Sequence, residues 1–150
     1  DNTDCGAACI ATICRQQGYN ISISKIREIA GTDKRGTNVY GMIQALNTLR
    51  FKVKGVKTKE INNDILREKI SLPCIAHVIV NDSLLHYVVI YKITKKHIII
   101  ADPAEGVMKI RIDEFIGKSE TAISISGQVC VYFLLKIINL IKHLQRVMYF

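Results

Sequence analysis

The segment TDCGAACIATIC spans residues 3–14 and predicts a helix of small and apolar side chains. Its alanines favour the helix, Thr3 and Asp4 are residue types that cap a helix N-terminus, and Gly18 is suited to end the helix. Cys5 is therefore expected in the first turn, where unpaired N–H groups and the helix dipole favour a thiolate. A backbone N–H at this position can also hold an oxyanion.

Two strand patterns follow later, LLHYVVIY at residues 84–91 and HIIIAD at residues 97–102, separated by a short polar turn. A three-residue loop over 93–95 would place His86 directly opposite Asp102, with β-carbons about 5 Å apart on one face. A register shift of one residue would separate the two side chains. A carboxylate beside an imidazole fixes its tautomer. With Cys5, this gives a nucleophile, its base and the group that orients the base.

Each residue type in this set also has a common structural role. A cysteine at a helix start is more often a small hydrophobe, a histidine in an apolar strand is more often a hydrogen-bonded core residue, and Asp-Pro often ends a strand. The other histidines are weaker candidates for the base that activates Cys5. His77 lies in a strand with no acid across from it, His97 adjoins a lysine-rich turn, and His143 lies in the terminal segment.

Length and composition predict one globular domain, because the 150 residues are 49% hydrophobic. The cysteines are odd in number and lack paired CxxC spacing, which argues against a disulfide framework or a structural zinc site and favours a reducing compartment. The N-terminal residues show no signal-peptide pattern, and no apolar run is long enough to cross a bilayer. The five cysteines are Cys5, Cys9, Cys14, Cys74 and Cys130.

A net charge of +8 raises the possibility of a nucleic-acid or membrane-surface partner. The basic residues are scattered and lack aromatic interleaving, so no nucleic-acid partner is expected. Residues 50–59 form the one local basic stripe, and Lys52 and Lys54 alternate there as in a half-exposed strand. We interpret the positive charge as a solvated face, or as a surface that attracts an acidic ligand or an anionic membrane leaflet.

The remaining patterns predict helices first and a mostly antiparallel sheet afterwards, which is an α+β fold. In chain order we expect a helix from Ser22 or Ser24 to Ala30, a helix from Thr37 or Asn38 to about Arg50, a strand over 51–56, a short helix from Asn62 or Asn63 to about Lys69, a strand over 74–80, the hairpin, a strand over 107–112, a helical turn over 113–117 and a strand over 128–135.

The last stretch has helical periodicity. Apolar residues recur at helical spacing from Leu134 to Met148, with basic residues on other faces. The helix can pack on its own domain or form a basic amphipathic linker that approaches a membrane. We expect the domain to cover residues 1–135 and a C-terminal amphipathic helix to cover residues 136–150.

Four segments together resemble the C39 peptidase family, which comprises cytosolic N-terminal domains of bacterial ABC exporters for bacteriocins, lantibiotics and quorum peptides. They are DCGAAC at 4–9, the segment 36–51, HYVVI at 86–90 and ADPAEG at 101–106. The resemblance covers roughly residues 3–135. It implies a papain-like cysteine peptidase fold, with Cys5 as nucleophile, His86 as general base and acid, and Asp102 as the residue that orients His86.

The resemblance also implies a substrate and partners. The peptidase would remove leader peptides after a Gly-Gly or Gly-Ala motif, and cleavage would be coupled to export. Its partners would be a precursor peptide with a double-glycine leader and the membrane and nucleotide-binding domains of the exporter. The domain would lie at the cytoplasmic face of the bacterial plasma membrane and be soluble in isolation. Proteolysis would need no metal or other cofactor, and ATP would serve a transporter domain outside this chain.

Glycine specificity suggests a channel too narrow for a β-carbon, beside an apolar groove for the leader. The loop GTNVYG at residues 36–41 is a candidate wall, although it can equally be a helix start flanked by glycines. The candidate substrate-binding residues are Gly6, Thr37, Asn38, Val39, Tyr40 and Tyr87.

Two family features are absent from this sequence. Family members carry a glutamine several residues before the cysteine, which donates to the oxyanion, and the four residues before Cys5 include none. We expect the glutamine to lie upstream of residue 1, and the alternative is that the oxyanion hole is weakened. A tryptophan common before the last family strand is also missing, and this bears on local packing there.

Two other function classes stay open at this stage. One is a non-catalytic domain that docks leader peptides, although such domains lack the nucleophile that Cys5 supplies. The other is a thiol redox or metal-binding protein that uses Cys5, Cys9 and Cys14. Thiol labelling separates them, because a single fast-reacting Cys5 is expected only of the peptidase.

Overall fold

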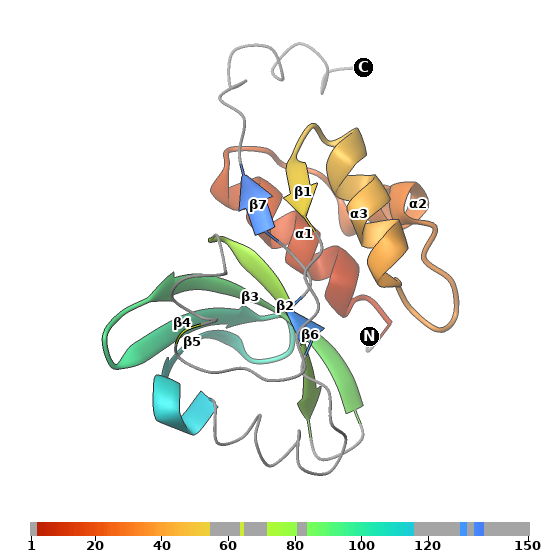
Figure 1. Cartoon of the computed structure of the whole chain (residues 1–150). Coiled ribbons are helices and arrows are strands. Elements are labelled where there is room, and N and C mark those ends of the chain that lie inside the picture. Colours follow the sequence, from red (N-terminus) through yellow and green to blue (C-terminus); the bar gives the residue numbers. More distant parts are fainter. Residues whose placement is uncertain are drawn as a thin grey trace.

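The computed structural model describes residues 3–54, 64, 72–80, 84–115, 130–131 and 134–136. This part of the chain places helices before an antiparallel sheet, as Figure 1 shows, and the α+β prediction is confirmed. The elements are α1 (Cys5–Gln16), α2 (Ile23–Ala30), α3 (Val39–Thr48), β1 (Lys52–Lys54), β2 (Cys74–Val80), β3 (Leu84–Ile93), β4 (His97–Asp102), β5 (Gly106–Arg111), β6 (Cys130–Val131) and β7 (Leu134–Lys136). Residues 112–115 form one helical turn.

Side-chain caps fix the starts of α2 and α3. The Ser22 hydroxyl accepts a hydrogen bond from the Lys25 N–H at 3.1 Å, and the Asn38 side-chain oxygen accepts one from the Gly41 N–H at 2.7 Å. Each cap satisfies one backbone donor that a helix start leaves unpaired. Ser22 and Asn38 were each one of two predicted alternatives, and Ser24 and Thr37 are not the caps.

The start of α1 is held differently from the prediction. Asp4 occupies the N-cap position of α1. Its side chain accepts no capping hydrogen bond from the described residues of the first turn. Its carboxylate instead faces the Arg27 guanidinium of α2 at 3.0 Å. Asp4 therefore joins α1 to α2, and Gly18, with φ of +86°, follows the C-cap Gln17 as predicted.

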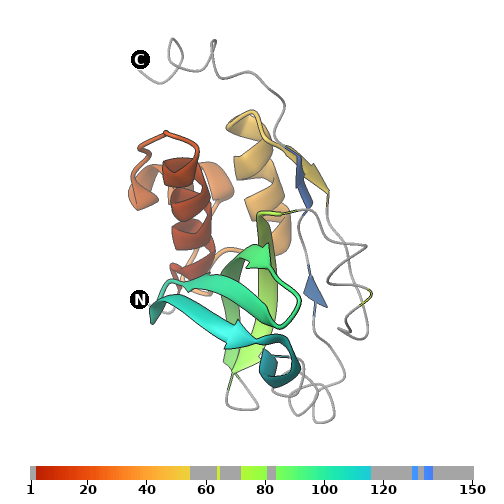
Figure 2. The same cartoon turned by 90° about the vertical axis from the view of Figure 1, so that its left-hand side faces the viewer.

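The strands form two antiparallel sheets within the described residues. One has the order β5-β4-β3-β2-β6, and the other pairs β1 with β7. The helices pack on one side of the larger sheet, with α1 against β3 (Figure 2). Alternation along β3 explains the two cores, because Tyr87 and Val89 pack with the helices while Val88 and Ile90 pack on the opposite face.

The hairpin between β3 and β4 differs from the predicted register. Its turn is closed by the Thr94 N–H donating to the His97 carbonyl at 2.8 Å, and Ile93 pairs with Ile98. A loop over 93–95 with direct pairing of His86 and Asp102 was therefore wrong. The pairing then shifts between Ile90 and Lys92, where Tyr91 is an extra residue of a β-bulge.

This bulge decides whether Asp102 lies on the same face of the sheet as His86. Continued without a shift, the pairing of Ile93 with Ile98 would set Asp102 opposite Val89, and His86 would then lie on the other face. The extra residue instead brings Ala101 opposite Val89, so Asp102 comes next to Val88. His86 and Asp102 are thereby diagonal neighbours on one face, as bulges near functional sites often arrange.

The C-terminal prediction is partly corrected. Residues 134–136 form β7 and pair with β1, which confirms the strand predicted as far as Leu135. A helix that begins at Leu134 is therefore wrong over these residues. Pairing with an available strand edge overrides their helical spacing, because it satisfies backbone groups that periodicity alone does not consider. The rest of the predicted terminal helix, and all of the predicted helix over 62–69 except Asp64, lie outside the described residues. No helix within the described ranges is long and apolar enough to span a bilayer.

Replacing Gly41 by alanine should destabilise the fold, because a β-carbon at this position would overlap the carbonyl oxygen of Ala30 where α2 and α3 meet. Overpacking of this kind costs about 1–3 kcal/mol. Urea unfolding followed by circular dichroism measures the loss. Gln44→Ala is the matched control on the exposed side of α3, expected within about 0.5 kcal/mol of the wild type. Equal stability of Gly41→Ala and the wild type would contradict this packing.

Candidate active site

Three separate segments meet at one end of the larger sheet. Cys5 lies in the first turn of α1 and is 9% exposed, His86 lies near the start of β3, and Asp102 is the last residue of β4. Figure 2 shows the start of α1 beside the end of the sheet where β4 turns into β5. The three residues that the sequence singled out are therefore brought together.

His86 and Asp102 form the best-defined contact of the site. The Nε2 atom of His86 lies 2.7 Å from Oδ1 of Asp102, and both side chains are 12% exposed. The same oxygen accepts a hydrogen bond from the Ala104 N–H at 2.7 Å. The turn after β4 therefore fixes the orientation of the carboxylate independently of the imidazole, because Asp side chains readily accept a hydrogen bond from the backbone two residues on.

The Cys5 sulfur is held from two sides. It hydrogen-bonds the His86 side chain and accepts from the backbone N–H groups of Tyr87 and Gly6. Since Asp102 engages Nε2 of His86, Nδ1 is the ring nitrogen left to face the sulfur. Sulfur, imidazole and carboxylate thus form one chain of contacts.

The protonation of Cys5 and His86 is coupled. Burial raises the pKa of the Cys5 thiol, but the hydrogen bonds from His86 and Tyr87 and the charge of His86 together lower it below its ordinary value. The pKa of His86 is raised to about 9, chiefly by its hydrogen bond to Cys5 and, against the opposing effect of burial, by Asp102. Both shifts favour the thiolate–imidazolium pair over the neutral thiol and imidazole.

The neighbouring cysteines have raised thiol pKa values, whereas the pKa of Cys5 is lowered. Cys9 is fully buried, and burial together with the charge of Cys5 raises its pKa well above the ordinary value. Burial raises the pKa of Cys14 to about 11. Within the described ranges, no group of three or more His, Cys, Asp or Glu side chains is placed to bind a metal ion. A redox or metal centre built on Cys5, Cys9 and Cys14 gains no support from this arrangement.

Two predicted substrate-binding residues pack against each other. A β-carbon on Gly6 would lie 3.2 Å from Cβ of Thr37 and 3.1 Å from Sδ of Met42. Thr37 is buried, and its hydroxyl lies 2.6 Å from that of Thr32. The absence of a side chain at Gly6 therefore lets the loop before α3 sit against the start of α1.

The other predicted substrate-binding residues differ in how exposed their side chains are. The side chain of Asn38 caps α3, and Val39 packs partly on the helical core. Tyr40 is 71% exposed, whereas Tyr87 is 7% exposed. Sequence reasoning missed that Tyr87 contributes a backbone N–H to Cys5, since backbone donors leave no residue-type signal.

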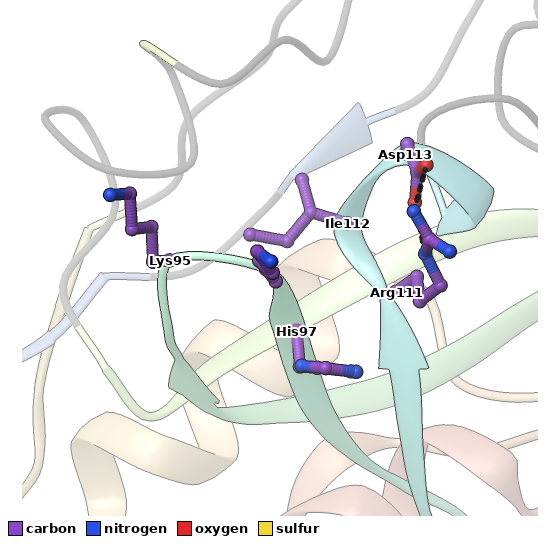
Figure 3. Close-up of a pocket in the computed structure, with 6 residues that line it drawn as sticks. Lys95, His97, Arg111, Ile112 and Asp113 are labelled. Atoms are coloured by element: carbon purple, nitrogen blue, oxygen red, sulfur yellow. Dashed lines mark hydrogen bonds and ion pairs between the residues drawn. The ribbon is translucent and has the colours of Figure 1, made fainter.

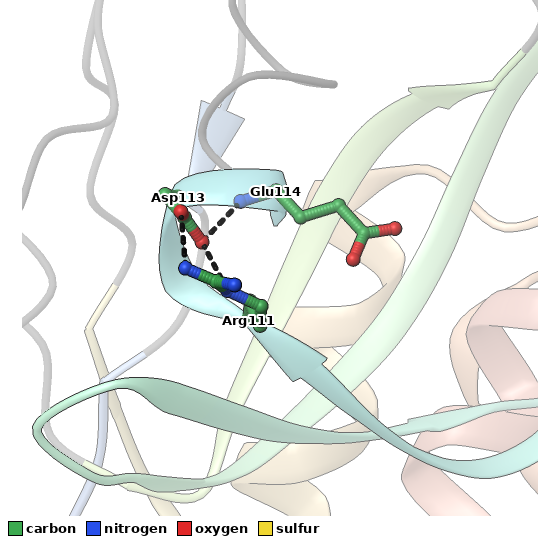
Figure 4. Close-up of polar contacts among 3 residues, drawn as sticks. All are labelled: Arg111, Asp113 and Glu114. Carbon is green, nitrogen blue, oxygen red and sulfur yellow. Dashed lines mark hydrogen bonds and ion pairs between the residues drawn. The ribbon is translucent and has the colours of Figure 1, made fainter.

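A hollow of about 350 Å³ lies elsewhere, at the turn end of the β3–β4 hairpin. Figure 3 shows its lining, which comprises Lys95, Lys96, His97, Arg111, Ile112 and Asp113. In Figure 4 the guanidinium of Arg111 donates two hydrogen bonds to the Asp113 carboxylate, from Nε at 3.1 Å and from Nη2 at 2.9 Å. Asp113 also accepts a hydrogen bond from the Glu114 N–H at 3.0 Å. This hollow contains none of the site residues, so it is not the candidate active site.

Comparison with known proteins finds one family model and relatives that are named as processing transporters. The model of the Peptidase C39 family matches residues 1–125. The lactococcin-G-processing and transport ATP-binding protein LagD of Lactococcus lactis subsp. lactis is 41% identical over 116 residues, which is 77% of this chain and 16% of LagD. The chain thus spans about a sixth of the length of that relative.

Solved structures give the same fold. The peptidase domain of Streptococcus ComA, a bifunctional ABC transporter of a quorum-sensing pathway, has a TM-score of 0.69 at 28% identity, covering 91% of this chain and 94% of that one. A double glycine motif protease from an AMS/PCAT transporter, solved with its leader peptide, has a TM-score of 0.67 at 24% identity, covering 88% and 85%. The predicted papain-like fold is confirmed by these matches.

His86→Ala should remove the activation of Cys5. Without the imidazole the main remaining influence is burial, which raises the thiol pKa, so alkylation by iodoacetamide at neutral pH should slow by more than about tenfold. The midpoint of the wild-type pH profile should lie below the ordinary thiol pKa of 9.0. The measurement is the pH profile of Cys5 alkylation by peptide mass spectrometry, with His97→Ala as the control histidine. Identical profiles for His86→Ala and wild type would disprove the pairing.

Proposed function

Because this chain belongs to the peptidase C39 family, whose members are cysteine peptidases, we propose that it cleaves leader peptides from exported precursors after a Gly-Gly or Gly-Ala pair. The observation that carries the proposal is the chain of contacts from Cys5 through His86 to Asp102. The names of LagD and of the double glycine motif protease support the substrate class, since they describe a processing transporter and a leader-peptide complex.

The proposed reaction begins with Cys5. Its thiolate attacks the carbonyl carbon of the second residue of the doublet, and the carbon–sulfur bond forms as the carbonyl oxygen becomes an oxyanion. The first turn of α1 directs backbone N–H groups and the positive end of the helix dipole toward that oxygen. The site thereby stabilises charge where it develops.

His86 completes both halves of the reaction in this proposal. As imidazolium it gives its proton to the departing amine, so the peptide C–N bond breaks and a thioester remains on Cys5. The neutral imidazole then takes a proton from water, whose oxygen attacks the thioester and releases the acid and the Cys5 thiolate. Asp102 holds the ring by Nε2 throughout, which keeps Nδ1 directed at the reacting atoms.

The proposed selectivity for glycine is steric. Gly6 packs closely on Thr37, and Tyr87 is buried in the same cluster as Cys5, so we assign Gly6, Thr37 and Tyr87 to the wall of the glycine channel. Asn38, Val39 and Tyr40 stand at the start of α3, where the exposed ring of Tyr40 can contact the leader. Apolar contacts of this kind suit an amphipathic leader helix.

The wider setting follows from the relatives and is part of the proposal. The chain spans a minor part of LagD, so its partners would be the membrane and nucleotide-binding domains of an exporter, together with the precursor. Peptide hydrolysis would take place at the cytoplasmic face of a bacterial plasma membrane. The cut itself uses thiol and imidazole chemistry, and ATP would act in the transport domains.

The test is cleavage of synthetic precursors by the 150-residue chain and its Cys5→Ala variant, followed by mass spectrometry. The wild type should cut a precursor with a Gly-Gly doublet, cut a Gly-Ala precursor more slowly and leave a Gly-Val precursor intact. Cys5→Ala should cut none of them while its unfolding free energy stays close to that of the wild type, because alanine suits a first helical turn.

Cys14→Ala is the control for loss of a thiol. It lies on the same helix and is fully buried, so cleavage per folded molecule should persist even though a buried side chain has been truncated. Cleavage by Cys5→Ala would refute the role of Cys5. Binding of the Gly-Gly precursor by the wild type without cleavage would favour a docking domain instead, and equal cutting of the Gly-Val precursor would refute the narrow channel.

A further inference from the structure

His77 stacks on a residue of the active site. It lies on β2 directly opposite Tyr87 of β3, and the two ring centroids are 4.2 Å apart at an interplanar angle of 13°. Tyr87 is buried in the cluster that includes Cys5, whereas His77 is half-buried beside it. The rings therefore form a nearly parallel pair across two central strands of the sheet.

Tyr87 links this pair to the nucleophile. Its backbone N–H donates to the Cys5 sulfur, and the residue before it is His86. The peptide unit between positions 86 and 87 thus carries both contacts on the sulfur that come from β3. A shift or rotation of this unit would weaken both contacts together.

The stack restrains that unit. A flat ring lying on Tyr87 limits the rotamers of the Tyr87 side chain, and aromatic pairs in contact stabilise their geometry beyond the area they bury. Burial and the charge of His86 lower the pKa of His77, so its ring remains neutral beside the charged pair. What His77 contributes is a flat surface and not a charge.

We propose that His77 is a positioning residue, which holds Tyr87 so that the Tyr87 N–H and the His86 imidazole both stay on the Cys5 sulfur. The inference rests on the proposed function only in taking Cys5 as the reactive thiol, and it needs no particular substrate. It assigns His77 an effect on the reactivity of Cys5 beyond ordinary packing of the sheet.

Two substitutions separate a flat ring from simple bulk. His77→Phe keeps a ring that can stack on Tyr87 but cannot ionise, and His77→Leu keeps apolar volume but has no flat face. Tyr87→Leu removes the other ring of the pair. His97→Leu is the matched control, because His97 is also a half-buried strand histidine but lies at the turn end of the hairpin.

The measurement is the midpoint of the pH profile for alkylation of Cys5 by iodoacetamide in the 150-residue chain, read on the Cys5 peptide by mass spectrometry. For His77→Leu and Tyr87→Leu the midpoint should rise by about half to one pH unit. This shift corresponds to the stabilisation that one stacked aromatic pair contributes. For His77→Phe and His97→Leu it should stay within about 0.2 of the wild type, well below that size.

Several results would overturn the proposal. An unchanged midpoint in His77→Leu would mean that the stack does not hold the site, and so would equal shifts in His77→Leu and His77→Phe. If His77→Leu unfolds, which alkylation of the buried Cys9 and Cys14 would reveal, Tyr87→Leu decides by the same criterion. Alkylation uses no peptide, so a failed substrate assay leaves this test intact.

Discussion

The structure depends on the contact between the Cys5 sulfur and the His86 imidazole, which joins the first helix to the sheet. Both groups are largely buried, and a buried charge is costly unless an opposite charge compensates it. Each group is therefore able to carry its charge because the other is present. The start of α1 adds a favourable field for the thiolate, and Asp102 adds one for the imidazolium.

Two local features make this contact possible. The bulge at Tyr91 returns His86 and Asp102 to a common face after a tight turn that would otherwise separate them. The missing side chain at Gly6 lets the loop before α3 close on the start of α1, which sets Cys5 at the edge of the helical core. One extra residue in a strand and one absent β-carbon thus both contribute to the arrangement of the site.

The sequence predicted the features that depend on local chemistry. The capping residues Ser22 and Asn38 and the apolar strand before Asp102 carry their own signals, and the structure has them at those positions. The hairpin register could not be predicted, because the bulge reflects packing of β3 against β2 and α1 as well as the turn. The strand predicted over 128–135 is present at residues 130–131 and 134–135, but its pairing with β1 was not predicted because β1 is distant in sequence. His77 was set aside because the search across its strand was for an acid, and its partner proved to be an aromatic ring.

The central claim is that Cys5 and His86 exist as an ion pair, and ¹⁵N NMR of the His86 ring tests it most directly. In the wild type the ring should stay protonated through neutral pH and titrate near 9. In Cys5→Ala the hydrogen bond that raises this pKa most is gone, so the titration should move to lower pH by at least about one unit. A His86 pKa that is the same in both proteins, or near 6.5 in the wild type, would contradict the account.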